Sequence, residues 1–179
     1  MQPFLRAWQP EDAEALIAAF LASDMASQGG PLDALEAARW IETRRWGASK
    51  VIRSLAVDLA GVAVGGVTLS GIETVHNTAW MSYWAAPEAR GRGLTTRAVA
   101  TLADWAFGNL DVFRLELGHR LNNPGSGKVA TGAGFVPEGL ERQKLRYDDQ
   151  RFDVVTYSRL RADPAPEVDL LPLKLVGGV

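Results

Sequence analysis

The sequence contains no cysteine, and this absence removes several classes of chemistry at once. A chain of 179 residues without cysteine has no disulfide framework, no thiolate metal site and no cysteine nucleophile. Histidine is also scarce, because only His76 and His119 are present, so we expect no histidine-rich metal centre. The reaction, if there is one, is expected to rely on other side chains and on the backbone.

The chain also lacks a strong charge of either sign and lacks long apolar runs. A formal net charge of −2 gives no electrostatic reason to expect nucleic acid as a partner. No apolar run approaches the roughly 18 residues of a membrane span. The first apolar stretch, residues 15–22, follows acidic residues instead of the basic lead of a signal peptide. We therefore expect a cytoplasmic protein without membrane contacts.

The pattern of apolar residues divides the chain into helices and strands without internal repeats. Helical patterns open at Pro10, Leu32, Leu94 and Asn123, and strand patterns cover residues 51–57, 62–72, 78–84, 113–117, 139–146 and 152–160. A glycine- and arginine-rich turn at residues 87–93 joins the third strand to the third helix. This order predicts an α/β (α+β) fold in which helices flank a mostly antiparallel sheet.

The length fits a single domain, which we place at residues 1–160, followed by a Pro-rich C-terminal tail at residues 161–179. Within the tail, the apolar residues 170–176 either add a strand, pack on a partner or remain loose. The six tryptophans are many for this length. Core packing is their commoner explanation, and a homodimer surface is the other.

The turn at residues 87–93 is the most informative stretch of the sequence. A strand, a Gly/Arg turn and a helix follow one another here, an order that aims several backbone N–H groups and a helix N-terminus at one point. Gly91 and Gly93 allow close approach of an anion, and Arg90 and Arg92 add positive charge. The alternative is an ordinary helix start with exposed arginines. The pattern therefore indicates a phosphate or pyrophosphate site.

Two other phosphate motifs fail on single residues. A dinucleotide fingerprint requires a third glycine where the chain has Thr96. A P-loop around residues 125–128 lacks its first glycine, because Asn122 stands there, and Val129 replaces the residue that would hold magnesium. Neither a dinucleotide-binding fold nor an NTPase is supported.

The same turn resembles the CoA-binding motif of the GNAT superfamily, Arg/Gln-x-x-Gly-x-Gly/Ala. Residues 90–95 match it except at the last position, Thr95. The lead-in at residues 83–93, the Asn-x-x-Ser at residues 123–126 and the Gly-Phe at residues 134–135 resemble the RimJ/RimL type, which acetylates N-terminal alanines of ribosomal proteins. The resemblance extends over about residues 4–160.

The resemblance implies a co-substrate, acetyl-CoA, bound between two splayed strands at residues 78–86 and 112–119. A backbone N–H near Trp84 or Ala85 would polarise the thioester carbonyl. Asn123 would hold the CoA arm, and Ser126 would protonate the leaving thiolate. The alternative for Ser126 is an ordinary hydroxyl at a helix start. The residues expected to contact CoA are Trp84, Ala85, Ala86, Arg90, Gly91, Arg92, Gly93, Leu94, Thr95, Asn123 and Ser126.

The general base is harder to assign, because Leu145 stands where some relatives place a glutamate. Glu73, just after the second strand, is the first candidate, and His76 and Glu116 are weaker ones. For Glu73 and His76 a role as turn residues is an equal alternative. For His119, a structural role is favoured over catalysis.

The acceptor is expected to be a primary amine. Deprotonating an α-amine of pKa about 7.8 at pH 7 costs roughly 1 kcal/mol, whereas a lysine of pKa about 10.4 costs roughly 4–5 kcal/mol. The lack of an obvious base therefore favours a peptide N-terminus. The alternatives are a small molecule such as a polyamine or an aminoglycoside, a bulkier acyl group such as succinyl, or a non-catalytic acyl-CoA sensor.

Overall fold

The computed structural model describes residues 2–22, 25 and 28–175. Its helices are α1 (Ala13–Leu21), α2 (Ala34–Arg44), α3 (Leu94–Asn109) and α4 (Pro124–Gly132), with the 3₁₀ turns η1 (Pro10–Asp12) and η3 (Pro87–Ala89). Its strands are β1 (Phe4–Arg6), β2 (Arg53–Leu59), β3 (Val62–Glu73), β4 (Thr78–Ala85), β5 (Arg114–Arg120), β6 (Val136–Tyr147), β7 (Gln150–Leu160) and β8 (Leu173–Lys174). In this part of the chain they form one eight-stranded sheet, in the order β6-β7-β5-β4-β3-β2-β1-β8.

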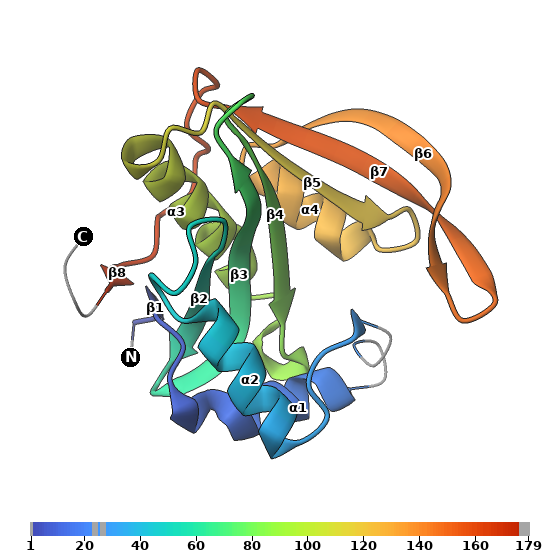
Figure 1. Ribbon diagram of the computed structural model, residues 1–179. Helices are drawn as coiled ribbons and strands as arrows, with labels where there is room; N and C mark the ends of the chain where they lie inside the picture. The colour runs from blue at the N-terminus through green and yellow to red at the C-terminus, as the bar shows by residue number, and fades with distance from the viewer. Residues whose placement is uncertain (1, 23–24, 26–27, 176–179) are drawn as a thin grey trace.

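Helices cover both faces of the sheet, as Figure 1 shows. The larger core lies between the sheet and helices α3 and α4, where buried residues such as Val67, Met81 and Leu102 meet. A smaller core on the opposite face packs α1 and α2 against the sheet through Leu16 and Ile41. Because side chains of a strand alternate between the two faces, neighbouring residues of β4 enter different cores.

Strands β4 and β5 form the feature that positions the site. They are parallel and pair only over three residues, Thr78–Trp80 of β4 with Arg114–Glu116 of β5. Beyond these residues β4 stays paired with β3, and β5 stays paired with β7. Figure 1 shows the two strands diverging from their common start. The other pairings are antiparallel except for β1 with β8, so the predicted fold, a mostly antiparallel sheet with splayed strands, is confirmed.

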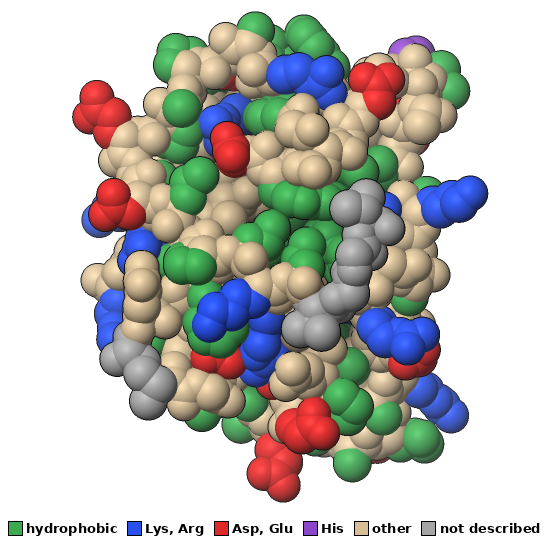
Figure 2. Space-filling model, turned by 90° about the vertical axis from the view of Figure 1, so that its left-hand side faces the viewer, with side chains coloured by type: hydrophobic (Ala, Val, Ile, Leu, Met, Phe, Trp, Pro, Cys, Tyr) green, Lys and Arg blue, Asp and Glu red, His purple; other side chains and the backbone are tan. Residues whose placement is uncertain are grey.

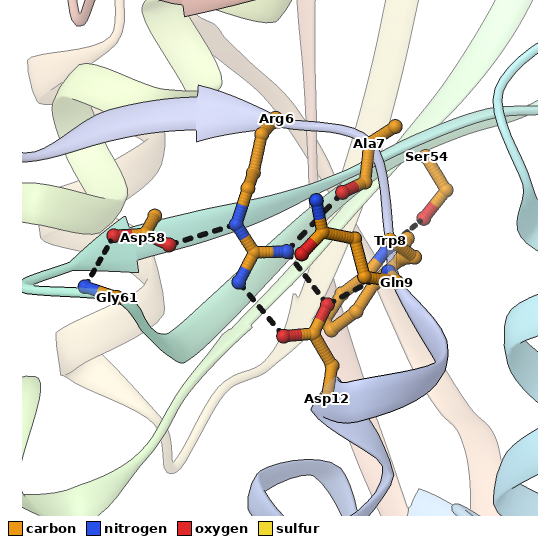
Figure 3. Close-up of polar contacts among 8 residues, drawn as sticks. All are labelled: Arg6, Ala7, Trp8, Gln9, Asp12, Ser54, Asp58 and Gly61. Carbon is orange, nitrogen blue, oxygen red and sulfur yellow. Dashed lines mark hydrogen bonds and ion pairs between the residues drawn. The ribbon is translucent and has the colours of Figure 1, made fainter. Parts of the chain in front are cut away.

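A buried ion-pair triad joins the first strand to the rest of the sheet (Figure 3). Arg6 of β1 donates from Nε to Asp58 of β2 at 2.7 Å and from both terminal nitrogens to Asp12 of η1 at 2.7 Å. The bond to Asp12 is the main cause that raises the pKa of Arg6. Close by, Trp8 donates from its indole N–H to the hydroxyl of Ser54 at 3.0 Å. These contacts fix the strand that the sequence analysis missed, because three residues are too few to show a period.

The described part of the tail, residues 161–175, contacts α3 and then joins the edge of the sheet. Leu171 is only 3% exposed, and its N–H donates to the hydroxyl of Thr101 in α3 at 2.8 Å. The next residue, Pro172, accepts from the N–H of Leu5 at 2.8 Å, and β8 then pairs in parallel with β1. Of the three alternatives for residues 170–176, the structure has the added strand; Val176 lies outside the described residues.

The face at the β8 edge of the sheet is the one turned toward the viewer in Figure 2. Hydrophobic side chains gather near the centre of this face, with acidic and basic side chains spread around them. This edge therefore offers no broad field of one charge. None of the described helices has the length and hydropathy that a membrane crossing requires.

Candidate functional site

A cavity of about 790 Å³ lies where β4 and β5 diverge and reaches both faces of the sheet. What we call its α4 side is lined by Arg90, Gly91, Thr95, Asn123 and Ser126. Its α2 side is lined by Trp40, Arg44, Trp80, Ser82, Arg120 and Tyr147. Alternation along the strands sets this division, because Tyr83 reaches α4 on one face while its neighbour Trp84 packs in the core under α1 and α2 on the other.

The α4 side contains residues 87–93, which we call the anion-binding turn after the role that the sequence predicts for it. Gly91 and Gly93 have φ values of +70° and +71°, the left-handed conformation that glycine adopts at little cost. Gly93 is also the N-cap of α3, a helix of 16 residues that no side chain of the described residues caps. The first-turn N–H groups and the helix dipole therefore remain available to an anion. Arg90 is held beside the turn by a 3.1 Å bond from its Nε to the carbonyl of Ala85.

The residues predicted to contact CoA divide into two groups. Those that line the cavity are Trp84, Ala85, Arg90, Gly91, Thr95, Asn123 and Ser126. Those that do not line it are Ala86, Arg92, Gly93 and Leu94. In the second group, Ala86 and Leu94 are buried in the protein interior. Gly93 nevertheless shapes the turn through its left-handed backbone.

The register of β4 determines which backbone groups face the cavity. The N–H of Ala86 donates to Val64 of β3 at 2.9 Å. Residues two apart in an antiparallel ladder direct their polar groups to the same side, so Trp84 also pairs with β3. Ala85 and Tyr83 then direct their N–H and C=O groups toward the gap. The backbone groups of Ala85, and not those of Trp84, are thus the ones aimed into the cavity.

The start of α4 presents a serine hydroxyl to the cavity. The side-chain oxygen of Asn123 caps this helix by accepting from the N–H of Ser126 at 3.2 Å. Its amide nitrogen keeps two donors for another partner. The Ser126 hydroxyl has no hydrogen-bond partner among the described residues and is half-buried. Tyr83 donates from its phenol to the carbonyl of Ser126 at 2.9 Å, and burial raises the pKa of this tyrosine.

Glu73 does not line the cavity. Its carboxylate accepts from the N–H groups of Val75, His76 and Thr78 at 2.9, 3.0 and 3.2 Å, so it closes the β3–β4 turn. These hydrogen bonds, led by the one from His76, lower the pKa of Glu73. The turn lies at the end of β4 where β4 and β5 are still paired, away from the anion-binding turn. The geometry therefore matches the alternative role, that of a turn residue.

The weaker base candidates are also accounted for by local contacts. Glu116 is bound by Arg114 at 2.6 Å, and neither Glu116 nor His76 lines the cavity. His119 does line it, but its Nδ1 lies 2.8 Å from the carbonyl of Arg120 and its Nε2 lies 3.2 Å from the Tyr157 hydroxyl. A carbonyl only accepts, so Nδ1 carries the proton and Nε2 accepts from the tyrosine. His119 is held as a structural residue.

Several cavity residues were not predicted from the sequence. Tyr83 was part of the recognised lead-in, and strand alternation would have placed it on the α4 face. Arg44, Arg120 and Tyr147 carried no local motif, because they come together only through the tertiary fold. The described residues contain no group of three or more His, Asp or Glu side chains that could hold a metal ion.

A family model described as an acetyltransferase (GNAT) domain matches residues 4–136, well over half of the chain. The chain belongs to the GNAT family. Among curated relatives, a putative ribosomal N-acetyltransferase of Bacillus subtilis is 31% identical over 103 residues, which is 58% of this chain and 56% of that protein. The ribosomal-protein-serine acetyltransferase of Escherichia coli is 29% identical over 97 residues, 54% of each chain. The matched segments thus span only about half of these relatives.

The same fold is found in solved GNAT structures. A RimL ribosomal L7/L12 α-N-protein acetyltransferase in complex with coenzyme A superposes with a TM-score of 0.78 at 19% identity, covering 89% of this chain and 94% of that one. A spermidine N-acetyltransferase from Vibrio cholerae, in complex with CoA and spermine, superposes with a TM-score of 0.77 at 22% identity, covering 90% and 97%. These likenesses show the GNAT fold, and the sequence relatives confirm the predicted resemblance to ribosomal-protein acetyltransferases.

Proposed function

We propose that this GNAT protein transfers the acetyl group of acetyl-CoA to the α-amine of a peptide or protein N-terminus. One observation carries the proposal. A single cavity at the β4–β5 split joins the anion-binding turn at Gly91 to the free hydroxyl of Ser126. CoA has a pyrophosphate that suits the turn and a pantetheine arm that suits the unpaired strand edge.

The residues of the chain fit the two ends of this co-substrate. The first turn of α3 and Arg90 would bind the pyrophosphate, and the backbone groups of Tyr83 and Ala85 would bind the amides of the arm. The amide nitrogen of Asn123, which its capping role leaves unused, supplies a further donor. Bound in this way, acetyl-CoA would supply the activated thioester for the transfer.

The transfer itself needs a donor at the carbonyl oxygen and a donor at the sulfur. The Ala85 N–H faces the gap and would stabilise the negative charge that develops on the carbonyl oxygen. The neutral amine attacks the carbonyl carbon, a C–N bond forms and the C–S bond breaks. The Ser126 hydroxyl would give its proton to the departing thiolate and recover one from solvent, while the amine releases its own proton to water.

An α-amine is the preferred acceptor because no described lining residue supplies a strong base. Aspartate and glutamate are absent from the described residues that line the cavity, and the Nε2 of His119 is engaged by Tyr157. Reaching the neutral form at pH 7 costs roughly 1 kcal/mol for an α-amine and roughly 4–5 kcal/mol for lysine. The sequence relationship to a ribosomal-protein-serine acetyltransferase supports the same class of acceptor.

The test follows the release of free thiol from acetyl-CoA in the presence of N-terminal peptides, lysine peptides, polyamines and aminoglycosides. We expect turnover on the N-terminal peptides. Ser126→Ala is expected to lower kcat by about 10²-fold, within the range for loss of a general acid, with little change in CoA affinity. Thr131→Ala is the matched control, because its hydroxyl lies on the same helix and donates to Gly127 at 3.0 Å, outside the cavity lining.

Three results would count against the proposal or against one of its parts. Faster acetylation of lysine side chains than of N-terminal amines would remove the α-amine as acceptor. Tight CoA binding without turnover on any amine would leave a sensor or a different acyl donor as the explanation. Equal loss of activity in the Ser126 and Thr131 variants would remove the specific role of Ser126.

A further inference from the structure

The α2 side of the cavity contains two arginines that are held by aromatic rings. The guanidinium of Arg44 lies 4.3 Å from the ring centre of Trp40, one turn earlier on α2. The guanidinium of Arg120 lies 4.7 Å from the ring centre of Tyr147. Arg44, Arg120, Trp40 and Tyr147 all line the cavity. Stacking on a ring orients a guanidinium while leaving its N–H edge accessible to a partner in the ring plane. Arg44 also donates from one terminal nitrogen to the Thr43 hydroxyl at 3.2 Å, which leaves its other N–H groups for a ligand.

Neither arginine is neutralised within the described chain. No described carboxylate lies within ion-pair distance of Arg44 or Arg120. Elsewhere the same side chain is paired: Arg6 binds two carboxylates, and Arg114 binds Glu116. The sequence has 21 acidic and 19 basic residues, so acidic residues are not in short supply. The unpaired positive charge is therefore a property of this side of the cavity.

Partial burial makes the unpaired charge of Arg44 costly, because water solvates it less. Arg44 is half-buried, and burial lowers its pKa without an opposing carboxylate. A half-buried guanidinium without a counter-ion is stabilised strongly when a ligand brings an anionic group next to it. It also repels a second cation at the same place, so a polyamine with several ammonium groups is a poor occupant.

The two arginines lie on the α2 side of the cavity, opposite the side assigned to CoA. Arg120 alternates with His119, whose ring faces α4 beside Gly127, so Arg120 points to the α2 face. Arg44 belongs to α2 itself. The anion-binding turn and Ser126 are on the opposite, α4 side. The positive charge of the α2 side is thus separate from the charge that would bind the CoA phosphates.

From this arrangement we propose that Arg44 and Arg120 bind carboxylates of the acceptor, which is a peptide N-terminus with Asp or Glu in its second or third residue. The proposal rests on the function proposed above and specifies its acceptor. An extended peptide advances about 3.3–3.6 Å per residue, so carboxylates at these positions lie within about 10 Å of the amine. The two cations also offset the acceptor's own carboxylates, which would otherwise raise the pKa of its amine.

The experiment uses the full chain and peptides that begin Ser-Glu-Glu, Ser-Gln-Gln or Ser-Lys-Lys and are otherwise identical. We expect kcat/KM for the Glu peptide to exceed that for the Gln peptide by about tenfold, and the Lys peptide to be the poorest. Arg44→Gln and Arg120→Gln are each expected to lower the Glu-to-Gln ratio to about two. Arg44→Lys should keep part of the Glu-to-Gln ratio of kcat/KM, because lysine retains the positive charge.

Arg45→Gln is the matched control. Arg45 follows Arg44 directly, but it is exposed and paired with Glu42 at 3.2 Å. We expect this variant to keep the full Glu-to-Gln ratio. If it lowers the ratio as much as Arg44→Gln does, the preference comes from the general charge of the surface and the proposed site is overturned. A second readout is the pH dependence of kcat/KM for the Glu peptide. Its acid limb should move to higher pH in Arg44→Gln, because loss of the cation raises the pKa of the bound amine.

Calorimetry with the N-acetylated peptides separates the two proposals, because binding of a product requires no turnover. Turnover with equal rates on the Glu and Gln peptides would overturn the anion site and leave acetyl transfer intact. A second outcome is no turnover on any peptide, while the acetylated Glu peptide binds at least tenfold more tightly than the acetylated Lys peptide and loses this preference in Arg44→Gln. This outcome would overturn acetyl transfer and leave the proposed carboxylate site intact. Absence of both turnover and charge-selective binding would overturn both.

Discussion

The phenol of Tyr83 donates a 2.9 Å hydrogen bond to the backbone carbonyl of Ser126 and thereby joins β4 to the first turn of α4. The two elements border the cavity from opposite sides of the strand split. The bond therefore sets the position of the Ser126 hydroxyl relative to the backbone groups of Ala85. Burial raises the pKa of Tyr83, so the phenol stays protonated and donating above the usual tyrosine pKa of about 10.

Tyr83→Phe is expected to lower kcat by about tenfold, because loss of one hydrogen bond of about 1 kcal/mol loosens the helix start that holds Ser126. The KM for acetyl-CoA should change less than kcat. Steady-state kinetics of thiol release measures both. Because Tyr83 does not ionise near neutral pH, the pH profile of the variant should have the same shape as that of the wild type. A shifted alkaline limb would mean that Tyr83 itself exchanges a proton during the reaction.

The parts of this site that the sequence predicted are those encoded locally. The turn around Gly91, the cap at Asn123 and the hydroxyl at Ser126 depend on residues next to one another in the chain, so their spacing identifies them. The positively charged α2 side brings together Arg44 and Arg120, which are 76 positions apart in the sequence numbering and have no motif in common. Such a pairing depends on the tertiary fold, which brings residues of α2 and β5 to the same cavity.

Of the two strands at this end of the sheet, β1 was not predicted, and β8 was given only as one of three alternatives for residues 170–176. Strands β1 and β8 have three and two residues, too few for alternation to be seen. They are stabilised by contacts over long sequence distances, such as the ion pair of Arg6 with Asp58 and the bond from Leu5 to Pro172. Hydrophobic periodicity predicts the long strands well because each alone shows a repeat.

Glu73→Gln tests whether the carboxylate closes a turn or acts as the base. We expect turnover within about twofold of the wild type and a lower urea midpoint, because the amide replaces one of the two acceptor oxygens that bind the turn N–H groups. The pKa of Glu73 is lowered in the folded state, so its stabilising effect is present above the ordinary carboxyl pKa and fades as the pH falls below it. A loss of kcat of about 10²-fold at unchanged stability would restore Glu73 as the base.

Glu138 gives the clearest pH dependence of stability. Hydrogen bonds, led by those from Arg114 and followed by that from Ser158, lower the pKa of Glu138 from 4.5 to about 2. A lowered folded-state pKa means that the stabilisation is present above about pH 4.5 and is lost as the pH falls toward 2. The Glu138 side chain is 42% exposed, so the contribution is about 1 kcal/mol or less.

Glu138→Gln should therefore be less stable than the wild type at pH 7 by this amount, and the two should converge as the pH falls. Urea unfolding at pH 7, 5, 4 and 3 measures the difference. Glu42→Gln is the control, because its ion pair with Arg45 is fully on the surface and should give a smaller difference at every pH. A difference for Glu138→Gln that stays constant from pH 7 to 3 would mean that ionisation of Glu138 does not contribute.

Leu171 tests whether the tail belongs to the folded domain. Its side chain is 3% exposed in the core shared with α3, whereas the adjacent Leu170 is 43% exposed. Leu171→Ala should lower the free energy of unfolding by about 2–4 kcal/mol, because it leaves a cavity in the core that the tail shares with α3. Leu170→Ala should change it by less than about 0.5 kcal/mol, as expected for an exposed position. Urea unfolding of the two variants measures both values, and equal values would mean that the tail does not pack on the domain in solution.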